Sequence, residues 1–290
     1  MTGPLPGTEF PFAPYRDAVI AVGTRHRKER QFRVPFRDVL GAHLLTPDDL
    51  DTDRFGTFTG EVSRVETAIE AARAKARLAM TVTGLPFGLA SEASYGTFGR
   101  LGWAGHQEVL IFCDADRDIE VLTGHRSLEV PGFAHRVGRS EDIPAALLDG
   151  LPAQGLIVRP AETAGTDGIT KGIVDVVTLR SAIVRAAAQS TDGHAVVEPD
   201  LRAHHNPTRQ QVLVHLAESL AHRLATPCPA CNSPGFGRVS TERGRPCRAC
   251  GTPTLLPLNE IHGCPACEYR ISHPVNETHA DPGDCPRCNP

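Results

Sequence analysis

Four Cys-x-x-Cys motifs crowd the C-terminal end of the chain and constrain its fold more than any other feature. A gap of two residues lets both thiolates of one motif reach the same tetrahedral metal ion. Disulfide bonds are the weaker explanation, because the chain shows no secretion signal and thiols inside cells stay reduced. The pattern predicts two zinc sites with four cysteine ligands each, drawn from Cys228, Cys231, Cys247, Cys250, Cys264, Cys267, Cys285 and Cys288.

The spacing leaves the pairing of these motifs open. If they pair in sequence order, the motifs of the two sites enclose 15 and 17 residues, which suits a hairpin in each zinc ribbon. Spacing alone does not exclude a cross-braced pairing, first with third and second with fourth. Either way each metal has four thiolates and no open position for water, so zinc is expected to be structural and not catalytic.

Residues 226–290 are therefore predicted to form a tandem zinc-ribbon domain. The 63 residues from Cys228 onward contain few large apolar side chains, so metal binding has to supply the folding energy. They contain six arginines, no lysine and six acidic residues. This balance argues against tight nucleic-acid binding and favours docking to a protein, either a partner or the chain's own N-terminal part.

The rest of the chain is long enough for one sizeable core. Residues 1–15, rich in Pro and Gly, suggest an irregular lead-in, and residues 16–225 suggest an α/β domain. No apolar run approaches the roughly 18 residues of a membrane span, and no signal peptide is evident, so we expect a cytoplasmic protein. A net charge of -4 argues against a general nucleic-acid binder. Dimerisation is left open.

A predicted helix over residues 62–82 and a predicted buried strand over residues 87–92 form the centre of this domain. Apolar residues recur on the helix at spacings of three and four, as on a helix that lies on a sheet. Glu92 closes a strand of small or apolar residues, and a buried carboxylate needs a partner. The hypothesis is that Glu70 and Glu92 bind Mg²⁺, while Lys75, about 140° from Glu70 around the helix, contacts phosphates.

Lysine is rare, with 3 lysines among the 30 basic residues: Lys28, Lys75 and Lys171. Chance can explain these positions, but a compact ammonium also suits a phosphate contact. The apolar run 17–22 predicts an interior strand that ends at Gly23 and Thr24 and is followed by the basic cluster 25–30. Such a cluster is commonly a solvated helix face. A strand that turns into a helix also exposes N–H groups that favour phosphate, which makes Thr24, Arg25 and Lys28 candidates.

A second candidate site precedes the last predicted helix of the α/β domain. Asn206 as N-cap and Pro207 at the first helical position form a strong helix start. Both Asn206 and Arg209 can be explained as capping and surface residues. Two histidines, His204 and His205, lie just before this start, and together these residues could bind a base or a phosphate.

Shorter segments complete a predicted mixed sheet flanked by helices. A carboxylate-rich loop is expected over 47–60, and Cys113 is expected to be a small buried hydrophobe. The segment 93–105 can be a lid or can place Trp103 in the core. Strands are expected at 41–45, 109–114, 118–123, 155–158 and 194–198, helices at 140–148 and 174–188, and a flexible loop with Lys171 at 161–172.

Segments 51–60, 70–80, 84–94 and 200–209, with the Cys-rich end, resemble a bacterial family known only as a domain of unknown function. A more distant similarity is to the inosine/xanthosine triphosphate pyrophosphatase superfamily. Its Thr-x-Asn-x-x-Lys turn is similar to Thr24–Lys28, and its Glu-Asn-Ala-x-x-Lys-Ala helix to Glu70–Ala76. Its Gly-Leu-Pro-like turn before an acidic strand end is similar to residues 84–92, and its Ser-His-Arg helix start loosely resembles residues 205–209. The two asparagines of the superfamily are absent.

This second resemblance implies an inosine triphosphatase-like fold and an Mg²⁺-dependent hydrolase. The substrate would be a nucleoside triphosphate or a related phosphorylated nucleotide, and the product pyrophosphate. Glu70 and Glu92 would bind Mg²⁺, and Lys28, Lys75 and Lys171 would neutralise phosphates. The alternative is a non-enzymatic adaptor that binds a nucleotide or nothing and docks a partner through its zinc ribbons.

Overall fold

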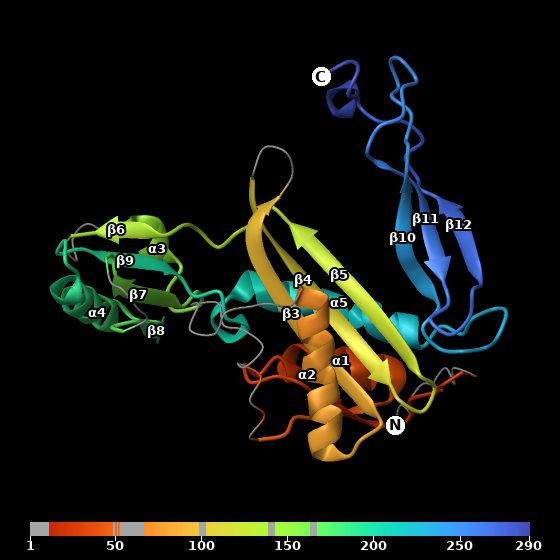
Figure 1. Ribbon diagram of the computed structural model, residues 1–290, viewed down its shortest axis with the longest axis horizontal. Helices are drawn as coiled ribbons and strands as arrows, with labels where there is room; N and C mark the ends of the chain where they lie inside the picture. The colour runs from red at the N-terminus through yellow and green to blue at the C-terminus, as the bar shows by residue number, and fades with distance from the viewer. Residues whose placement is uncertain are drawn as a thin grey trace, which may run out of the picture.

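The computed structural model describes residues 12–48, 50, 52, 67–98, 103–138, 143–162 and 167–290. It is a mixed α/β structure with three separate sheets, which Figure 1 shows spread along the long axis of the molecule. A five-stranded sheet with three helices occupies the centre. A four-stranded sheet lies on one side of it, and a three-stranded sheet with the cysteines lies on the other.

The central sheet has the strand order β2-β1-β3-β4-β5. Its strands are β1 (Val19–Val22), β2 (His43–Leu45), β3 (Phe87–Phe98), β4 (Trp103–Asp114) and β5 (Ile119–Ser127). β1 runs parallel to both β2 and β3, whereas β3, β4 and β5 form an antiparallel meander. β1 ends opposite Leu89, so β3 continues well beyond the carboxyl end of β1. Ligands commonly bind at such carboxyl ends in α/β sheets.

Helices cover both faces of this sheet. On one face, α1 (Glu29–Leu40) and α5 (Pro207–Leu224) bury aromatic and aliphatic side chains against β1, β3 and β4. On the other face, α2 (Ala68–Thr83) packs mainly through alanines. Alternate residues of a strand point to opposite faces. A residue's position along β3 or β4 therefore decides which helices its side chain can reach.

The alanine face lets α2 approach the sheet closely. A β-carbon at Gly88 would lie 2.7 Å from the carbonyl oxygen of Ala76, and one at Gly23 would collide with the carbonyl of Lys75. Only glycine fits at these two positions. The helix begins after Thr67, whose hydroxyl accepts a hydrogen bond from the Glu70 amide while the Glu70 carboxylate accepts one from the Thr67 amide. The predicted start at residue 62 lies outside the described residues, and the described helix begins at Ala68, directly after this capping box.

The four-stranded sheet has the order β6-β9-β7-β8 and is antiparallel throughout. It consists of β6 (His135–Val137), β7 (Leu156–Pro160), β8 (Thr170–Ile173) and β9 (Ala195–Pro199), with α3 (Ala145–Asp149) and α4 (Val176–Gln189) packed on it. The mixed sheet flanked by helices that the sequence predicts is confirmed in the central sheet. The strands expected at 155–158 and 194–198 belong instead to this second sheet, which buries a separate apolar cluster.

The third sheet is an antiparallel meander of β10 (Gly237–Arg243), β11 (Pro257–Gly263) and β12 (Arg270–Pro274). It joins the central domain at the end of α5. There Arg223 donates to the carbonyls of Leu122 on β5, at 2.8 Å, and of Gly235 before β10, at 3.2 Å. One half-buried arginine therefore links α5, the central sheet and the cysteine-rich part.

Most predicted elements are present with shifted ends. The strand expected at 87–92 continues to Phe98, and the segment 93–105 contributes to two paired strands instead of a lid. Lys171 lies in β8 and not in a loop. Cys113 is buried, as expected.

Residues 1–11 of the lead-in and all of the 51–60 segment except Thr52 lie outside the described part. None of the described helices is both long and apolar enough to cross a membrane.

Candidate functional site

The eight motif cysteines form two groups of four. Cys228, Cys231, Cys264 and Cys267 form the first group, and Cys247, Cys250, Cys285 and Cys288 form the second. Within the groups, neighbouring sulfur atoms are 3.5 to 3.9 Å apart. Four thiolates about 2.3 Å from a tetrahedral zinc ion would be separated by about 3.8 Å. The donor set and its spacing therefore fit two zinc ions.

The pairing is the cross-braced one, first motif with third and second with fourth. The meander explains this arrangement. β10 runs from the first motif to the second, β11 runs back to the third, and β12 leads to the fourth. Consecutive motifs therefore lie at opposite ends of the strands, and alternate motifs meet at the same end. Pairing in sequence order is wrong, because each site would have to span the length of the sheet.

The first two motifs share the same local backbone. In each, the amide of the residue after the second cysteine donates to the carbonyl of the first cysteine: Asn232 to Cys228 and Gly251 to Cys247. Asn232 and Gly251 have φ values of 58° and 72°, a region that asparagine and glycine tolerate best. The sequence thus allows the tight turn that aims both thiolates at one metal.

In the central domain, the candidate residues surround a buried ion pair. Arg209, in the first turn of α5, donates from Nε to Oε2 of Glu108 at 2.6 Å and from a terminal nitrogen to Oε1 at 3.1 Å. Another terminal nitrogen donates to the carbonyl of Leu201. Arg209 is 1% exposed and Glu108 is fully buried. Arg209 is predicted to bind a base or a phosphate; in the structure its guanidinium donates to Glu108 and Leu201 inside the protein.

Lys28 lies next to this pair, just before α1. Its ammonium donates to the carbonyl and hydroxyl oxygens of Ser91 at 2.9 and 3.0 Å, and it lies 3.9 Å from Glu108. Burial, reinforced by the positive charge of Arg209, lowers the pKa of Lys28 from 10.5 to about 7, and Glu108 and Glu92 oppose this shift. An anion placed beside Lys28 would favour its charged form.

Lys75 and Glu92 form a second buried ion pair, with 2.5 Å between Nζ and Oε2. Ser91 and Glu92 are successive strand residues, so they point to opposite faces of β3. Glu92 therefore faces α2, whereas the Lys28 and Arg209 cluster lies on the face of α1 and α5. The charges of Glu92 and Lys75 still act on the Lys28 pKa. Lys28, Lys75 and Glu92 thus lie around the end of β1, with Lys28 on one face of the sheet and Lys75 and Glu92 on the other.

Glu70, the other carboxylate of the predicted Mg²⁺ pair, is used differently. Its carboxylate is exposed and accepts hydrogen bonds from the amide and hydroxyl of Thr67, at 2.8 and 2.7 Å. These bonds lower its pKa. Lys75, the partner of Glu92, lies five residues further along α2, about 7.5 Å of helix rise. Glu70 is thus bonded at the start of α2, whereas Glu92 on β3 contacts α2 further along, at Lys75.

A cationic cleft of about 500 Å³ opens beside this cluster, between the start of α1 and the short 3-10 helix η3 (Ala203–His205) before α5. No carboxylate is found among the described residues that line it. It is lined by Arg25, His26, Arg27, Arg30, Gln31, His204, His205 and Gln210. The structure therefore brings Arg25, His204 and His205, from the two candidate sites, to one cleft and adds residues from α1 and α5.

The positive charge of this cleft at pH 7 comes from its arginines and not from His26 and His204. Burial, with the nearby charge of Lys28, lowers the pKa of His26 to about 3. Burial and His205 lower that of His204 to about 4. The two rings stack at 5.2 Å and are neutral at pH 7. Arg27 has a φ of 53°, and such strained positions cluster at functional sites. The start of α1 adds the positive end of a helix dipole.

The remaining predicted residues have supporting positions. The Thr24 hydroxyl accepts from the amide of His26 and shapes the turn. Asn206 caps α5 through the Arg209 amide and donates from its side chain to the Tyr95 hydroxyl at 3.2 Å, so its capping role is confirmed. Lys171 does not line the cleft. The adjacent Gly172 packs against the ring of His205, a lining residue, so Lys171 lies beside the cleft.

Glu108, Ser91 and Tyr95 were missed as site residues. Glu108 precedes the strand predicted at 109–114. It shares a face with Leu110 and Phe112, both in the core. Extending that strand by one residue would have placed the Glu108 carboxylate on the core face, so the sequence did contain a signal for a buried acidic residue. Nothing in the sequence indicates that its partner comes from Arg209, 101 residues away.

A family model described as a domain of unknown function, DUF6671, matches residues 75–290. The chain belongs to this family. The match includes Lys75, Glu92, Glu108, Arg209 and all the zinc-ligand candidates, whereas the Thr24–Lys28 turn precedes it. The chain matches no curated protein and no solved structure.

Zinc content of double variants distinguishes the two pairings. Cys231→Ser with Cys264→Ser removes two ligands of one site, so this DUF6671 protein should keep one zinc ion per chain. Cys231→Ser with Cys250→Ser damages both sites and should remove both ions. Metal analysis of the purified chains measures this, and Cys113→Ser is a control that should retain both ions. Pairing in sequence order would give the opposite result for the two double variants.

Removing one partner of the buried Arg209–Glu108 pair should strongly destabilise the fold. Arg209→Met leaves the Glu108 carboxylate buried beside Lys28 alone, and we expect a loss of roughly 3–5 kcal/mol in unfolding free energy. Replacing Glu108 by Met as well should recover most of this loss, because the buried carboxylate without its guanidinium is then gone and Lys28 still donates to Ser91. Urea denaturation measures both variants. Equal stabilities of the single and double variants would contradict the assignment.

The lowered pKa of Lys28 predicts a pH dependence of stability. Between pH 7 and about 10, the unfolded chain binds a proton at this lysine that the folded chain has lost. The contribution of Lys28 to the unfolding free energy therefore rises with pH, by up to about 1.4 kcal/mol per unit. Denaturation at pH 7, 8 and 9 measures the unfolding free energy of the wild type and of Lys28→Met. The value for the wild type minus that for the variant should increase with pH. A difference independent of pH would be evidence against the lowered pKa.

Proposed function

We propose that the α/β domain binds the phosphates of a nucleoside triphosphate or a related phosphorylated nucleotide in the cationic cleft. We further propose that it hydrolyses this ligand with the help of Mg²⁺ and releases pyrophosphate. The observation that supports this most is the cleft at the carboxyl end of β1. Three arginines, three histidines and no carboxylate line it among the described residues, next to Lys28, Lys75 and Glu92.

Each element of the cleft suits a phosphorylated ligand. Arginines Arg25, Arg27 and Arg30 can donate paired hydrogen bonds to phosphate oxygens, and the start of α1 favours an anion. Gln31 and Gln210 can donate and accept, as a base or sugar requires. The neutral His26 and His204 rings contribute polar and planar surface without adding charge. Lys28 would become fully charged beside a phosphate.

The hydrolytic step would depend on Glu92. Mg²⁺ prefers oxygen ligands and is usually held by one or two carboxylates together with substrate phosphates. Glu92 offers one such carboxylate, and Glu70 could join only by leaving its bonds to Thr67. When bound, Mg²⁺ would offset the charge that develops at the scissile phosphate. Lys75 would orient Glu92 through their ion pair.

One observation favours a second candidate, a nucleotide-binding or protein-docking adaptor without activity. Both buried carboxylates of the cluster already have cationic partners, Glu92 with Lys75 and Glu108 with Arg209. Such pairs also occur as purely structural networks. In an adaptor, the cleft would bind a nucleotide without turnover, or bind none, and the zinc ribbons would contact the partner.

Pyrophosphate release from a panel of nucleoside triphosphates with Mg²⁺ tests the proposal. At least one nucleotide should be hydrolysed, and Glu92→Gln should lower the rate at least about a hundredfold, since it removes a carboxylate from the reaction site. Glu120→Gln is the matched control. Glu120 lies on β5, paired with Arg73 and Arg77 near the surface, and its replacement should leave the rate unchanged.

Thermal shift with the same nucleotides separates the candidates. Stabilisation of both the wild type and Glu92→Gln, without pyrophosphate release from either, would support the binding adaptor and reject hydrolysis. Neither release nor stabilisation by any nucleotide would reject nucleotide binding and leave the protein-docking role. Undiminished release by Glu92→Gln would remove Glu92 from the mechanism.

A further inference from the structure

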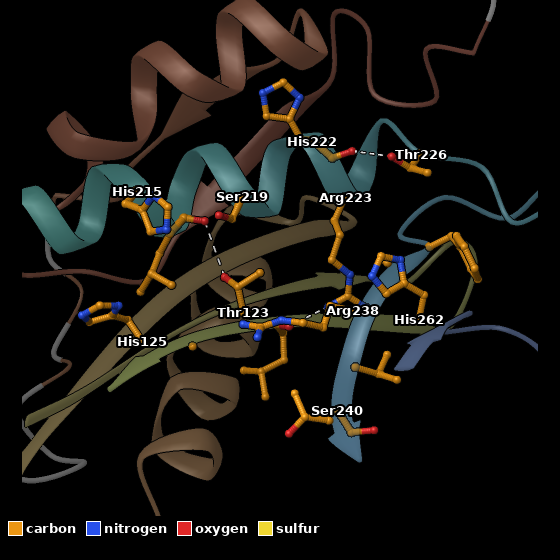
Figure 2. Close-up of a pocket in the computed structure, with 17 residues that line it drawn as sticks. Thr123, His125, His215, Ser219, His222, Arg223, Thr226, Arg238, Ser240 and His262 are labelled. Atoms are coloured by element: carbon orange, nitrogen blue, oxygen red, sulfur yellow. Dashed lines mark hydrogen bonds between the residues drawn. The ribbon is translucent and has the colours of Figure 1, made fainter. Parts of the chain in front are cut away.

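A second and larger cleft, of about 920 Å³, lies between the central domain and the zinc-binding sheet (Figure 2). The proposed hydrolase function makes no use of it. β5, the later part of α5 and β10 supply most of its lining. Figure 2 shows His125 and His215 at one end and Arg223, Arg238 and His262 at the other. The cleft is a candidate surface for a partner molecule.

Two sheet edges open onto this cleft. β5 is the last strand of the central sheet, and β10 is the first strand of the zinc-binding sheet. Leu122 to His125 of β5 and Gly237 to Thr241 of β10 are among the lining residues. A strand at a sheet edge presents unpaired backbone N–H and C=O groups that can pair with another extended chain. The cleft is therefore a place where a strand can be added.

Of the outer strands of the central and zinc-binding sheets, β10 is the one most open to such pairing. Among the described strands, it pairs only with β11. β2 has three residues, and β12 is short and ends in Pro274, two features that protect an edge. On β5, the carbonyl of Leu122 already accepts a hydrogen bond from Arg223. β10 has seven residues without a proline, and all but the first are exposed.

The charge of the cleft indicates the kind of segment that fits. Its lining contains two arginines, four histidines and several hydroxyl groups, and no Asp or Glu among the described residues. Glu260 on β11, which is not a lining residue, lies 3.5 Å from Arg238 and 3.7 Å from His262. Arg223 is held in place by the carbonyls of Leu122 and Gly235. An acidic segment would meet complementary charge here.

We propose that the edge of β10 binds an extended acidic segment of a partner protein as an additional strand. Backbone hydrogen bonds to β10 would supply affinity, and acidic side chains directed at Arg238 and Arg223 would supply selectivity, as in other cases of strand addition. The first zinc site lies where β10 begins and β11 ends, and so stiffens the edge that receives the segment. This inference is independent of nucleotide binding and hydrolysis.

A fluorescein-labelled peptide of four Val-Glu repeats tests the proposal with the zinc-loaded full chain, by fluorescence anisotropy. The peptide should bind, and a peptide of four Val-Lys repeats should not. Methylation of alternate backbone nitrogens on the edge that faces β10 should weaken binding at least about tenfold, or about 1.4 kcal/mol, because it removes ladder hydrogen bonds. Since that edge is not known beforehand, both alternating methylation patterns are measured, and one of them should weaken binding.

Protein variants locate the binding surface. Arg238→Glu should weaken binding of the Val-Glu peptide at least about tenfold. Arg270→Glu changes an exposed arginine on β12, outside the cleft, and is the matched control. Arg30→Glu changes the other cationic cleft. Both should bind as the wild type does.

Three results would overturn the proposal. The first is no binding of the Val-Glu peptide up to about 1 mM, a free energy of only about -4 kcal/mol. The second is equal binding of both methylated peptides, which would show that backbone pairing is not involved. The third is binding that Arg30→Glu weakens and Arg238→Glu does not, which would place the peptide in the nucleotide cleft.

Discussion

The ion pair between Arg209 and Glu108 holds the central domain in its arrangement. It joins the start of α5 to the middle of the meander, and its neighbour Lys28 brings in the start of α1. Three segments far apart in the sequence therefore share one buried electrostatic contact. Two helix starts and their cations consequently lie around the end of β1. The position of the cationic cleft follows from this internal ion pair, because residues next to Lys28 and Arg209 in the sequence line the cleft.

The buried charges also divide the site between the two faces of the sheet. Lys75 and Glu92 lie under α2, and the close approach of that helix depends on glycines at 23 and 88. Lys28 and Arg209 lie under α1 and α5. β3 separates these two groups, and all four side chains are buried. The groups remain close at the carboxyl end of β1, where the charges of Glu92 and Lys75 act on Lys28.

Local patterns in the sequence predicted local features well. The Asn206-Pro207 start of α5, the hairpin of β4 and β5 and the eight cysteine ligands all follow from short-range chemistry. Long-range pairing could not be predicted in the same way. Thr67 and Glu70 have the spacing of a capping box, so the use of the Glu70 carboxylate could have been read from the local sequence. Glu108 and Arg209, in contrast, meet only because two distant elements pack together. The cross-braced pairing could have been predicted, because three strands of similar length between four motifs bring alternate motifs to the same end of the sheet.

The interleaved metal sites have a consequence for how the chain matures. During synthesis the first and second motifs emerge before the third. A zinc ion that arrives early can therefore bind Cys228, Cys231, Cys247 and Cys250, a set that the finished fold does not contain. To reach the native state, the nascent chain then has to exchange thiolates between metals once Cys264 and Cys267 appear. The supply of zinc during translation, and not only its final concentration, can thus influence how much protein folds correctly.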